Sequence, residues 1–151
     1  WHVVVATNQS GLGRGLFDAY TLNEMHAKMN ALLMPLGGRV DAVFFCPHAP
    51  EDDCRCRKPR PGLFEDIGLR FGIDMTGVPA VGDTLRDLQA ASAVGCTPHL
   101  VRTGKAASLD EAGVQAMREK VPGLTVHADL AAFVDALLAA EGRRAADGRR
   151  A

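Results

Sequence analysis

Short apolar runs alternate with longer amphipathic segments along the whole of this chain. The short runs are rich in valine and other β-branched or aromatic residues, which are typical of buried strands. This alternation predicts an α/β fold in which parallel strands form a sheet that helices cover on both faces. The expected strands are residues 1–6, 40–45, 78–81, 99–101 and 124–126, and the expected helices are 21–36, 61–71, 85–94, 108–120 and 130–140.

Local signals set the expected ends of the helices. Thr21 with Glu24, and Ser108 with Glu111, have the spacing of a capping box at a helix start. Gly37 and the glycine that follows it are expected to end the first helix. Three methionines recur at helical spacing and are expected in the core on that helix: Met25, Met29 and Met34.

The chain has 151 residues, 47% of them hydrophobic and 23% charged, which suits one globular domain with one core. Its net charge of −1 gives no overall attraction to nucleic acid or to an anionic membrane, so neither is an expected partner. No apolar run reaches the roughly 18–20 residues that cross a bilayer. We expect a monomeric, cytoplasmic protein with a domain at residues 1–142 and a polar, disordered tail at 143–151.

Three cysteines and one histidine gather in a single short segment: Cys46, His48, Cys54 and Cys56. These ligands suit a tetrahedral Cys3His zinc site, and four protein ligands leave no open position, so the zinc would be structural. Such clustering favours a metal and a reducing compartment over a disulfide framework. The alternative is a set of buried free thiols, which is also the interpretation of the isolated Cys96.

A carboxylate follows the expected strand at residues 78–81. Asp83 stands at its carboxyl end, the edge at which parallel sheets bind ligands. An oxygen ligand there suits Mg²⁺, and Mg²⁺ suits phosphate chemistry. Asp83 is equally consistent with a helix N-cap, and Asp87 is interpreted as an acid in the first turn of that helix.

Two further polar segments are candidates for anion binding. Hydroxyl, amide and backbone N–H groups at residues 7–11 follow the first strand and can hold phosphoryl oxygens, although an ordinary turn would have the same residues. Arg57 and Lys58 follow the last cysteine of the cluster. Arg57 offers a bidentate fork for phosphate and Lys58 a point charge. The alternative is that this basic pair lies on a solvated surface. Four histidines have no partner in the sequence and are expected to be packed or at the surface: His2, His26, His99 and His127.

In this order the motifs resemble the haloacid dehalogenase (HAD) superfamily. Thr7 is similar to its second motif, Lys58 to its third, and Asp83 with Asp87 to its fourth. The segment CPHAPEDDCRCRKPRPG resembles the loop of histidinol-phosphate and heptose-bisphosphate phosphatases, and the segments TNQSGLGRG and LVRTGK are more similar to the heptose-bisphosphate group. The resemblance implies a Rossmann-like parallel sheet with helices on both faces and an inserted zinc loop.

The resemblance also implies a Mg²⁺-dependent phosphomonoesterase that acts on a small phosphorylated sugar. In the family an aspartate attacks the substrate phosphorus, and water hydrolyses the aspartyl-phosphate. Thr7 and Lys58 would hold the transferring phosphoryl oxygens, and Asp83 would be a Mg²⁺ ligand. The substrate-binding residues that the resemblance implies are Asn8, Ser10, Arg57 and Lys58.

One motif of the family does not occur in this chain. The first motif, Asp-x-Asp-Gly, supplies the nucleophile and the acid/base group on a central strand, and no Asp-x-Asp occurs in these 151 residues. Because the other three motifs match, we interpret the gap as truncation rather than degeneration, and we predict that the chain as written has no phosphatase turnover. Two alternatives are a histidinol-phosphate phosphatase and, in a different class, a catalytically inactive zinc-stabilised binding module.

Overall fold

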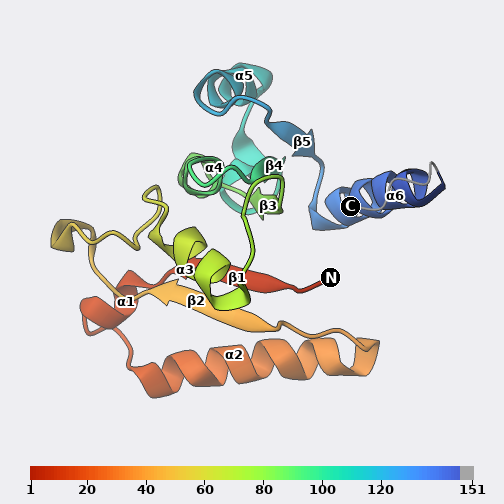
Figure 1. The fold of residues 1–151 in the computed structure, drawn as a ribbon. Helices are drawn as coiled ribbons and strands as arrows, with labels where there is room; N and C mark the ends of the chain where they lie inside the picture. The colour runs from red at the N-terminus through yellow and green to blue at the C-terminus, as the bar shows by residue number, and fades with distance from the viewer. Residues whose placement is uncertain (147–151) are drawn as a thin grey trace. The chain divides into compact units, whose positions relative to one another are not determined.

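The computed structural model describes residues 1–146, and the chain divides into two compact units, Trp1–Asp74 and Met75–Ala151 (Figure 1). The first unit contains β1 (Val4–Asn8), α1 (Ser10–Gly13), α2 (Ala19–Leu33), β2 (Ala42–Cys46) and α3 (Gly62–Phe71). The second contains β3 (Pro79–Gly82), α4 (Leu85–Ser92), β4 (Thr97–Val101), α5 (Glu111–Lys120), β5 (Thr125–His127) and α6 (Leu130–Ala146). Short 3-10 turns lie at Met34–Leu36, Pro50–Asp52 and Gly104–Ser108.

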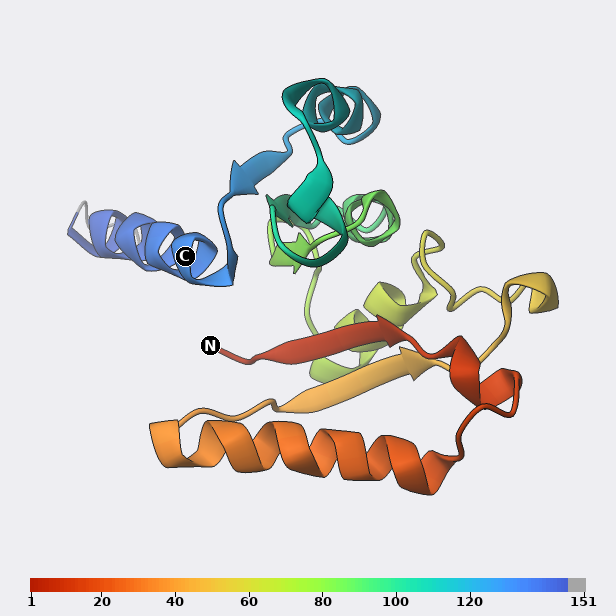
Figure 2. The same cartoon turned by 180° about the vertical axis from the view of Figure 1, so that it is seen from behind.

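In the first unit β1 and β2 are parallel neighbours, and their arrowheads lie at the same end in both ribbon views (Figures 1 and 2). The register pairs Val4 with Ala42 at one end and Asn8 with Cys46 at the other. The helix α2 joins the two strands and buries Leu22. The polar segment after β1 and the cysteine-rich loop after β2 therefore begin side by side, at the carboxyl edge of this sheet.

In the second unit the three strands form a parallel sheet in the order β3-β4-β5. Its core combines residues of α4, β4 and α5 with residues of the connecting turns: Leu88, Leu100, Ala106, Val114, Val121 and Leu124. Leu100 is fully buried in the middle strand, between neighbours on both sides. The loop that begins at Asp83 leaves this sheet at the carboxyl end of β3.

The predicted α/β architecture of parallel strands and helices is confirmed, and the hydrogen-bonded strands form a two-stranded and a three-stranded sheet. Within residues 1–146 no hydrogen-bonded ladder joins β1 or β2 to the other three strands. Strand residues are recognisable from their local pattern, whereas pairing depends on hydrogen bonds between segments that are distant along the chain. The family resemblance implies one further, central strand that carries the Asp-x-Asp motif, and that motif does not occur here.

Both predicted capping boxes are wrong. The cap of α2 is Asp18, whose carboxylate accepts a hydrogen bond from the Thr21 N–H at 2.8 Å. The cap of α5 is Asp110, whose carboxylate accepts from the Gly113 N–H at 2.8 Å, so Ser108 lies outside the helix. In both cases an aspartate captures the free amide of the first turn, and its charge also interacts favourably with the helix dipole.

The expectation that the methionines of the first helix lie in the core is wrong for two of them. Met25 is 49% exposed and Met34 is 71% exposed, while Met29 is half-buried. Leu22 and Met29 are two helical turns apart and lie on the same stripe, whereas Met25 lies at its flank. Helical spacing identifies a wide apolar stripe, and packing decides which part of it is covered.

The helix α6 runs to Ala146, so the prediction of a polar, disordered tail from residue 143 is wrong for residues 143–146, which are helical. The rest of that expected tail, residues 147–151, lies outside the residues that the structure describes. Among the described helices, none combines the length and apolar character that crossing a membrane requires.

Candidate functional site

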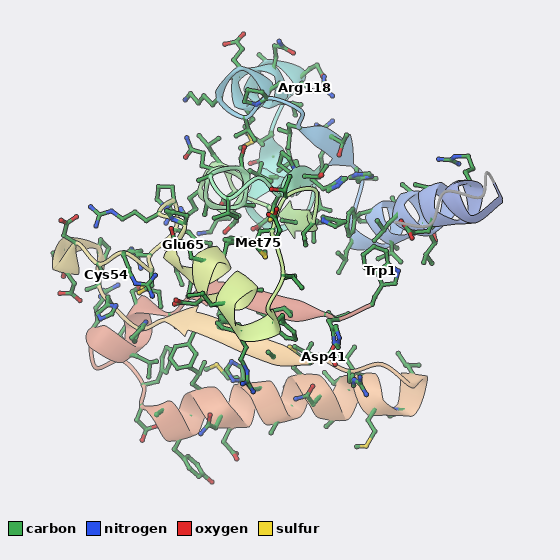
Figure 3. All side chains as sticks on the ribbon, in the orientation of Figure 1. Trp1, Asp41, Cys54, Glu65, Met75 and Arg118 are labelled. Atoms are coloured by element: carbon green, nitrogen blue, oxygen red, sulfur yellow. The ribbon has the colours of Figure 1, made fainter. Side chains whose placement is uncertain are left out.

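The four predicted zinc ligands form one cluster at the end of β2 and on the loop that follows it, where Figure 3 labels Cys54. Their ligand atoms all lie within 4.8 Å of one another. Cys46 Sγ lies 3.6 Å from His48 Nδ1 and 3.5 Å from Cys54 Sγ, and His48 Nδ1 lies 3.3 Å from Cys56 Sγ. A tetrahedral zinc with Zn–S bonds of about 2.3 Å separates its sulfur ligands by about 3.7 Å, so the cluster has the size and donors of a Cys3His site.

The three thiols of the cluster are chemically suited to a cation. They form no disulfide. Burial, together with the neighbouring Cys46 and Cys54, raises the pKa of the Cys56 thiol to about 12. Burial also raises the pKa of Cys46, whereas the hydrogen bonds of Cys54 with Cys56 and Cys46 outweigh burial and lower the pKa of Cys54. The two thiols with a raised pKa keep their protons unless a cation compensates the charge, and metal binding to thiolates supplies that compensation.

The segment that contains the four candidate ligands, residues 46–56, is called the metal loop, and its start is held by the segment that follows β1. The Gln9 N–H donates to the Cys46 carbonyl at 2.7 Å, and the Gly13 N–H donates to the Pro47 carbonyl at 2.9 Å. A Cβ atom at Gly13 would lie only 2.7 Å from the Pro47 oxygen, so a glycine is needed for this approach. The backbone of α1 and of the residue before it therefore fixes the first two residues of the loop.

Lys58 is a buried lysine with 8% of its surface exposed. Its Nζ donates to the Ala6 carbonyl at 2.6 Å. The side-chain amide of Asn8 brackets the Lys58 main chain: Oδ1 accepts from the Lys58 N–H at 3.1 Å, and Nδ2 donates to the Lys58 carbonyl at 3.2 Å. These contacts fix a positive charge at the carboxyl end of β1.

The other predicted residues of the first unit lie around the same strand end. Thr7 Oγ1 accepts a hydrogen bond from Gln9 Nε2 at 3.2 Å, and Ser10 is the first residue of α1. Arg57 Nη1 donates to the His48 carbonyl at 3.2 Å, so its guanidinium is tied to a residue of the cysteine cluster. The first unit thus gathers the predicted phosphate- and substrate-binding residues beside the metal loop: Thr7, Asn8, Ser10, Arg57 and Lys58.

Asp83 belongs to the second unit and follows β3. Its Oδ2 accepts a hydrogen bond from the Lys105 N–H at 2.8 Å. Gly104 allows this contact, because its φ is +54° and a Cβ there would clash with Asp83 Oδ2. The N-cap of α4 is Thr84, whose N–H donates to Asp87 Oδ2 at 3.1 Å. The helix-cap alternative for Asp83 is therefore wrong, and the interpretation of Asp87 as a first-turn acid is confirmed.

Sequence reasoning missed the partners of several of these groups. Gln9 belongs to the polar segment 7–11, but no pattern indicates its bond to Thr7, and Gly104, which allows the contact of Asp83, carries no chemical signal of its own. His99 Nδ1 lies 3.1 Å from His127 Nε2, and both rings pack on Phe133 of α6 at centroid distances of 4.8 and 5.5 Å. The two histidines are 28 residues apart, so no local spacing indicates their pairing.

The sequence matches a known family and several named relatives. The sequence profile of the HAD-hydrolase-like family matches residues 55–131. The D-glycero-beta-D-manno-heptose-1,7-bisphosphate 7-phosphatase of Bordetella bronchiseptica is 54% identical over 139 residues, which cover 91% of this chain and 74% of the relative. The enzyme of the same name from Pseudomonas aeruginosa is 46% identical over 139 residues, with the same two coverages.

A solved structure agrees with these sequence matches. The crystal structure of the D,D-heptose 1,7-bisphosphate phosphatase from B. bronchiseptica, complexed with magnesium and phosphate, is similar to this chain with a TM-score of 0.82. The likeness covers 91% of this chain and 74% of that chain, at 54% sequence identity. Profile, sequence identity and fold agree on the family. This chain therefore belongs to the HAD-hydrolase-like family, among its phosphatases.

Proposed function

We propose that the protein is a Mg²⁺-dependent phosphatase that removes the 7-phosphate of D-glycero-β-D-manno-heptose 1,7-bisphosphate through an aspartyl-phosphate intermediate. The observation that carries the proposal is a buried lysine held at the end of β1 beside a Cys3His loop, in a chain 54% identical to a phosphatase named for this substrate. The 151 residues would supply groups that hold the phosphoryl and sugar parts of the substrate. They contain no Asp-x-Asp to supply the nucleophile.

Thr7 and Lys58 would hold the transferring phosphoryl group. A threonine hydroxyl has one donor and two acceptor sites, and Gln9 donates to the Thr7 oxygen, so the Thr7 proton can be directed at a phosphoryl oxygen. The Ala6 carbonyl fixes the direction of the Lys58 ammonium group. A preorganised positive charge stabilises negative charge that develops on the phosphoryl oxygens in the transition state.

Asp83 fits the role of one Mg²⁺ ligand. It is a carboxylate at the carboxyl end of a parallel strand, and the Lys105 N–H fixes its orientation through Oδ2. A bound Mg²⁺ would neutralise charge on the phosphoryl group. By the family resemblance the remaining protein ligands are the aspartates of the first motif.

Asn8, Ser10 and Arg57 would contact the rest of the substrate. The Arg57 guanidinium is suited to the second phosphate or the sugar because it offers a planar fork of donors. Its bond to the His48 carbonyl couples its position to the cysteine cluster. A structural Zn²⁺ held by Cys46, His48, Cys54 and Cys56 would therefore keep Arg57 and Lys58 on a rigid support.

The test adds the missing motif and compares two substrates. A protein with an Asp-x-Asp-Gly segment from a relative joined before Trp1 is expected to release phosphate from the heptose bisphosphate with a higher kcat/KM than from histidinol phosphate. K58A is expected to lower kcat by about 10²–10³-fold, because it removes a charge that stabilises the transition state. R70A, at an exposed arginine of α3, is the matched control and should leave kcat unchanged. A higher kcat/KM for histidinol phosphate would favour that alternative.

The chain as written provides a second test. Purified protein of these 151 residues is expected to show no Mg²⁺-dependent phosphate release, and measurable release would contradict the assignment of the nucleophile to the first motif. If the protein with the added motif binds the heptose bisphosphate without hydrolysing it, the binding-module alternative is favoured. We also propose that the protein is a cytoplasmic monomer, which light scattering can check for the oligomeric state.

A further inference from the structure

The metal loop contains a residue with an uncommon backbone conformation. Asp53 has a φ of +46°, and it is the one residue other than glycine with a positive φ within residues 1–146. The left-handed region costs an L-residue free energy, although aspartate and asparagine tolerate it better than most. Asp53 directly precedes the ligand Cys54. The orientation of Cys54, and with it the position of its Sγ atom, therefore depends on the conformation of Asp53.

Arg60 reaches back to the same turn. Its Nη1 donates to the Asp53 carbonyl at 2.6 Å and to the Cys54 carbonyl at 3.1 Å. Its Nη2 donates to the Asp53 carboxylate. The two carbonyls belong to the peptide groups on either side of Cys54. One guanidinium group thus holds both of these peptide groups and the side chain of the left-handed residue.

Separate contacts hold the other parts of the loop. Before the turn, the Asp52 carboxylate accepts from the Ala49 N–H at 2.8 Å. After the turn, Arg55 donates to Glu65 and Asp66 of α3 at 3.1 and 2.5 Å, and Figure 3 labels Glu65 on that helix. Neither set of contacts includes the peptide groups that flank Cys54.

We infer that Arg60 is a positioning residue of the metal loop, which keeps Cys54 Sγ in place for the metal by holding the Asp53 turn in its left-handed conformation. A ligand side chain that is already in place loses less conformational freedom when the metal binds, so the metal is held more tightly and dissociates more slowly. Residues that orient metal ligands without touching the metal commonly change metal affinity by about 10–100-fold when they are mutated. The inference does not depend on the phosphatase reaction, because metal release is measured without turnover.

The test is the rate at which the zinc-loaded protein releases zinc to an excess of a chromogenic chelator. R60A is expected to release zinc about 10-fold faster than the unmodified protein. R60K should be intermediate, because one ammonium group does not reproduce the planar fork that reaches two carbonyls and a carboxylate. R70A removes an exposed arginine from the end of α3 and should release zinc at the original rate. Equal rates for R60A and the original protein would overturn the inference.

A second comparison separates this conformational role of Arg60 from a direct effect of its positive charge on the thiolates of the metal site. Asp53→Gly removes the contacting carboxylate but accepts a positive φ without strain. If Arg60 acts by holding the turn, adding R60A to D53G should accelerate release less than R60A does alone. An equal acceleration in both backgrounds would contradict the conformational role. The cobalt-loaded proteins provide a spectroscopic readout, because the visible bands of Co²⁺ report a tetrahedral thiolate site, and R60A should weaken them.

Discussion

At the scale of single residues, the side chain of Asn8 holds the main chain of Lys58 through hydrogen bonds. Both are predicted to bind the substrate, yet the side chain of Asn8 makes two hydrogen bonds to the main chain of Lys58, a residue 50 positions away. An amide is well suited to this, because it carries a donor and an acceptor side by side. Asn8 therefore orients a buried lysine, whether or not it also contacts the substrate.

We predict that N8A lowers the free energy of unfolding by about 1–3 kcal/mol, because it leaves the Lys58 N–H and carbonyl without these partners. Urea unfolding followed by circular dichroism measures the change. N30A is the matched control: Asn30 is exposed on α2, and its replacement should change stability by less than about 0.5 kcal/mol. Equal, small changes for the two variants would show that the bonds to Lys58 do not stabilise the first unit.

At the scale of elements, two histidines join β4 and β5 to α6. The strand register places His99 opposite Thr125, and both His99 and His127 pack on Phe133. Burial, and secondarily the neighbouring His127, lowers the pKa of His99 below its ordinary value of 6.5. The neutral imidazole is therefore the form that fits this junction of elements.

The lowered pKa of His99 predicts a loss of stability in mild acid. Below pH 6.5 the unfolded chain binds a proton at His99 that the folded chain resists, so stability is full above that pH and falls as the pH drops towards the folded pKa. The midpoint of urea unfolding at about pH 7.5 and about pH 5.5 measures the loss. H99Q should reduce the loss and the control H26Q should not. An unchanged loss in H99Q would assign the pH dependence to other groups.

At the scale of the whole molecule, the two units differ in how deeply they bury their strands. All five residues of β1 are half-buried, and none is fully buried. In β4, Pro98, Leu100 and Val101 are buried, and the strand has a partner on each side. Protection against local opening increases with burial and with hydrogen bonding on both edges.

We therefore predict that amide hydrogens of β4 exchange with solvent more slowly than those of β1. Hydrogen exchange followed by mass spectrometry of peptides that contain each strand measures the difference. The paired strand β2 is a useful control, because it shares the two-stranded sheet of β1 and should exchange on a similar time scale. Exchange of β4 as fast as that of β1 would contradict the link between burial and local stability.

Much of the fold could be predicted because its signals are local. Short apolar runs mark the strands, apolar spacing marks the helices, and the expected positions differ from the observed ones mainly at their ends. The helix starts were misplaced because Asp18 and Asp110, just upstream, are better placed to accept the free amides. Local signals did not show which strands pair, because pairing depends on hydrogen bonds between segments that are distant along the chain.

The sequence by itself determined the family and the cluster of candidate metal ligands, because Cys46, His48, Cys54 and Cys56 lie so close along the chain that their chemistry is visible without a fold. Only the tertiary structure decided which groups meet across long separations. It joins Asn8 to Lys58, sets the Lys105 amide against Asp83, and brings His99 to His127. Local spacing fixes the conformation of a segment, whereas these contacts arise only when distant segments pack, and no short pattern of residues encodes them.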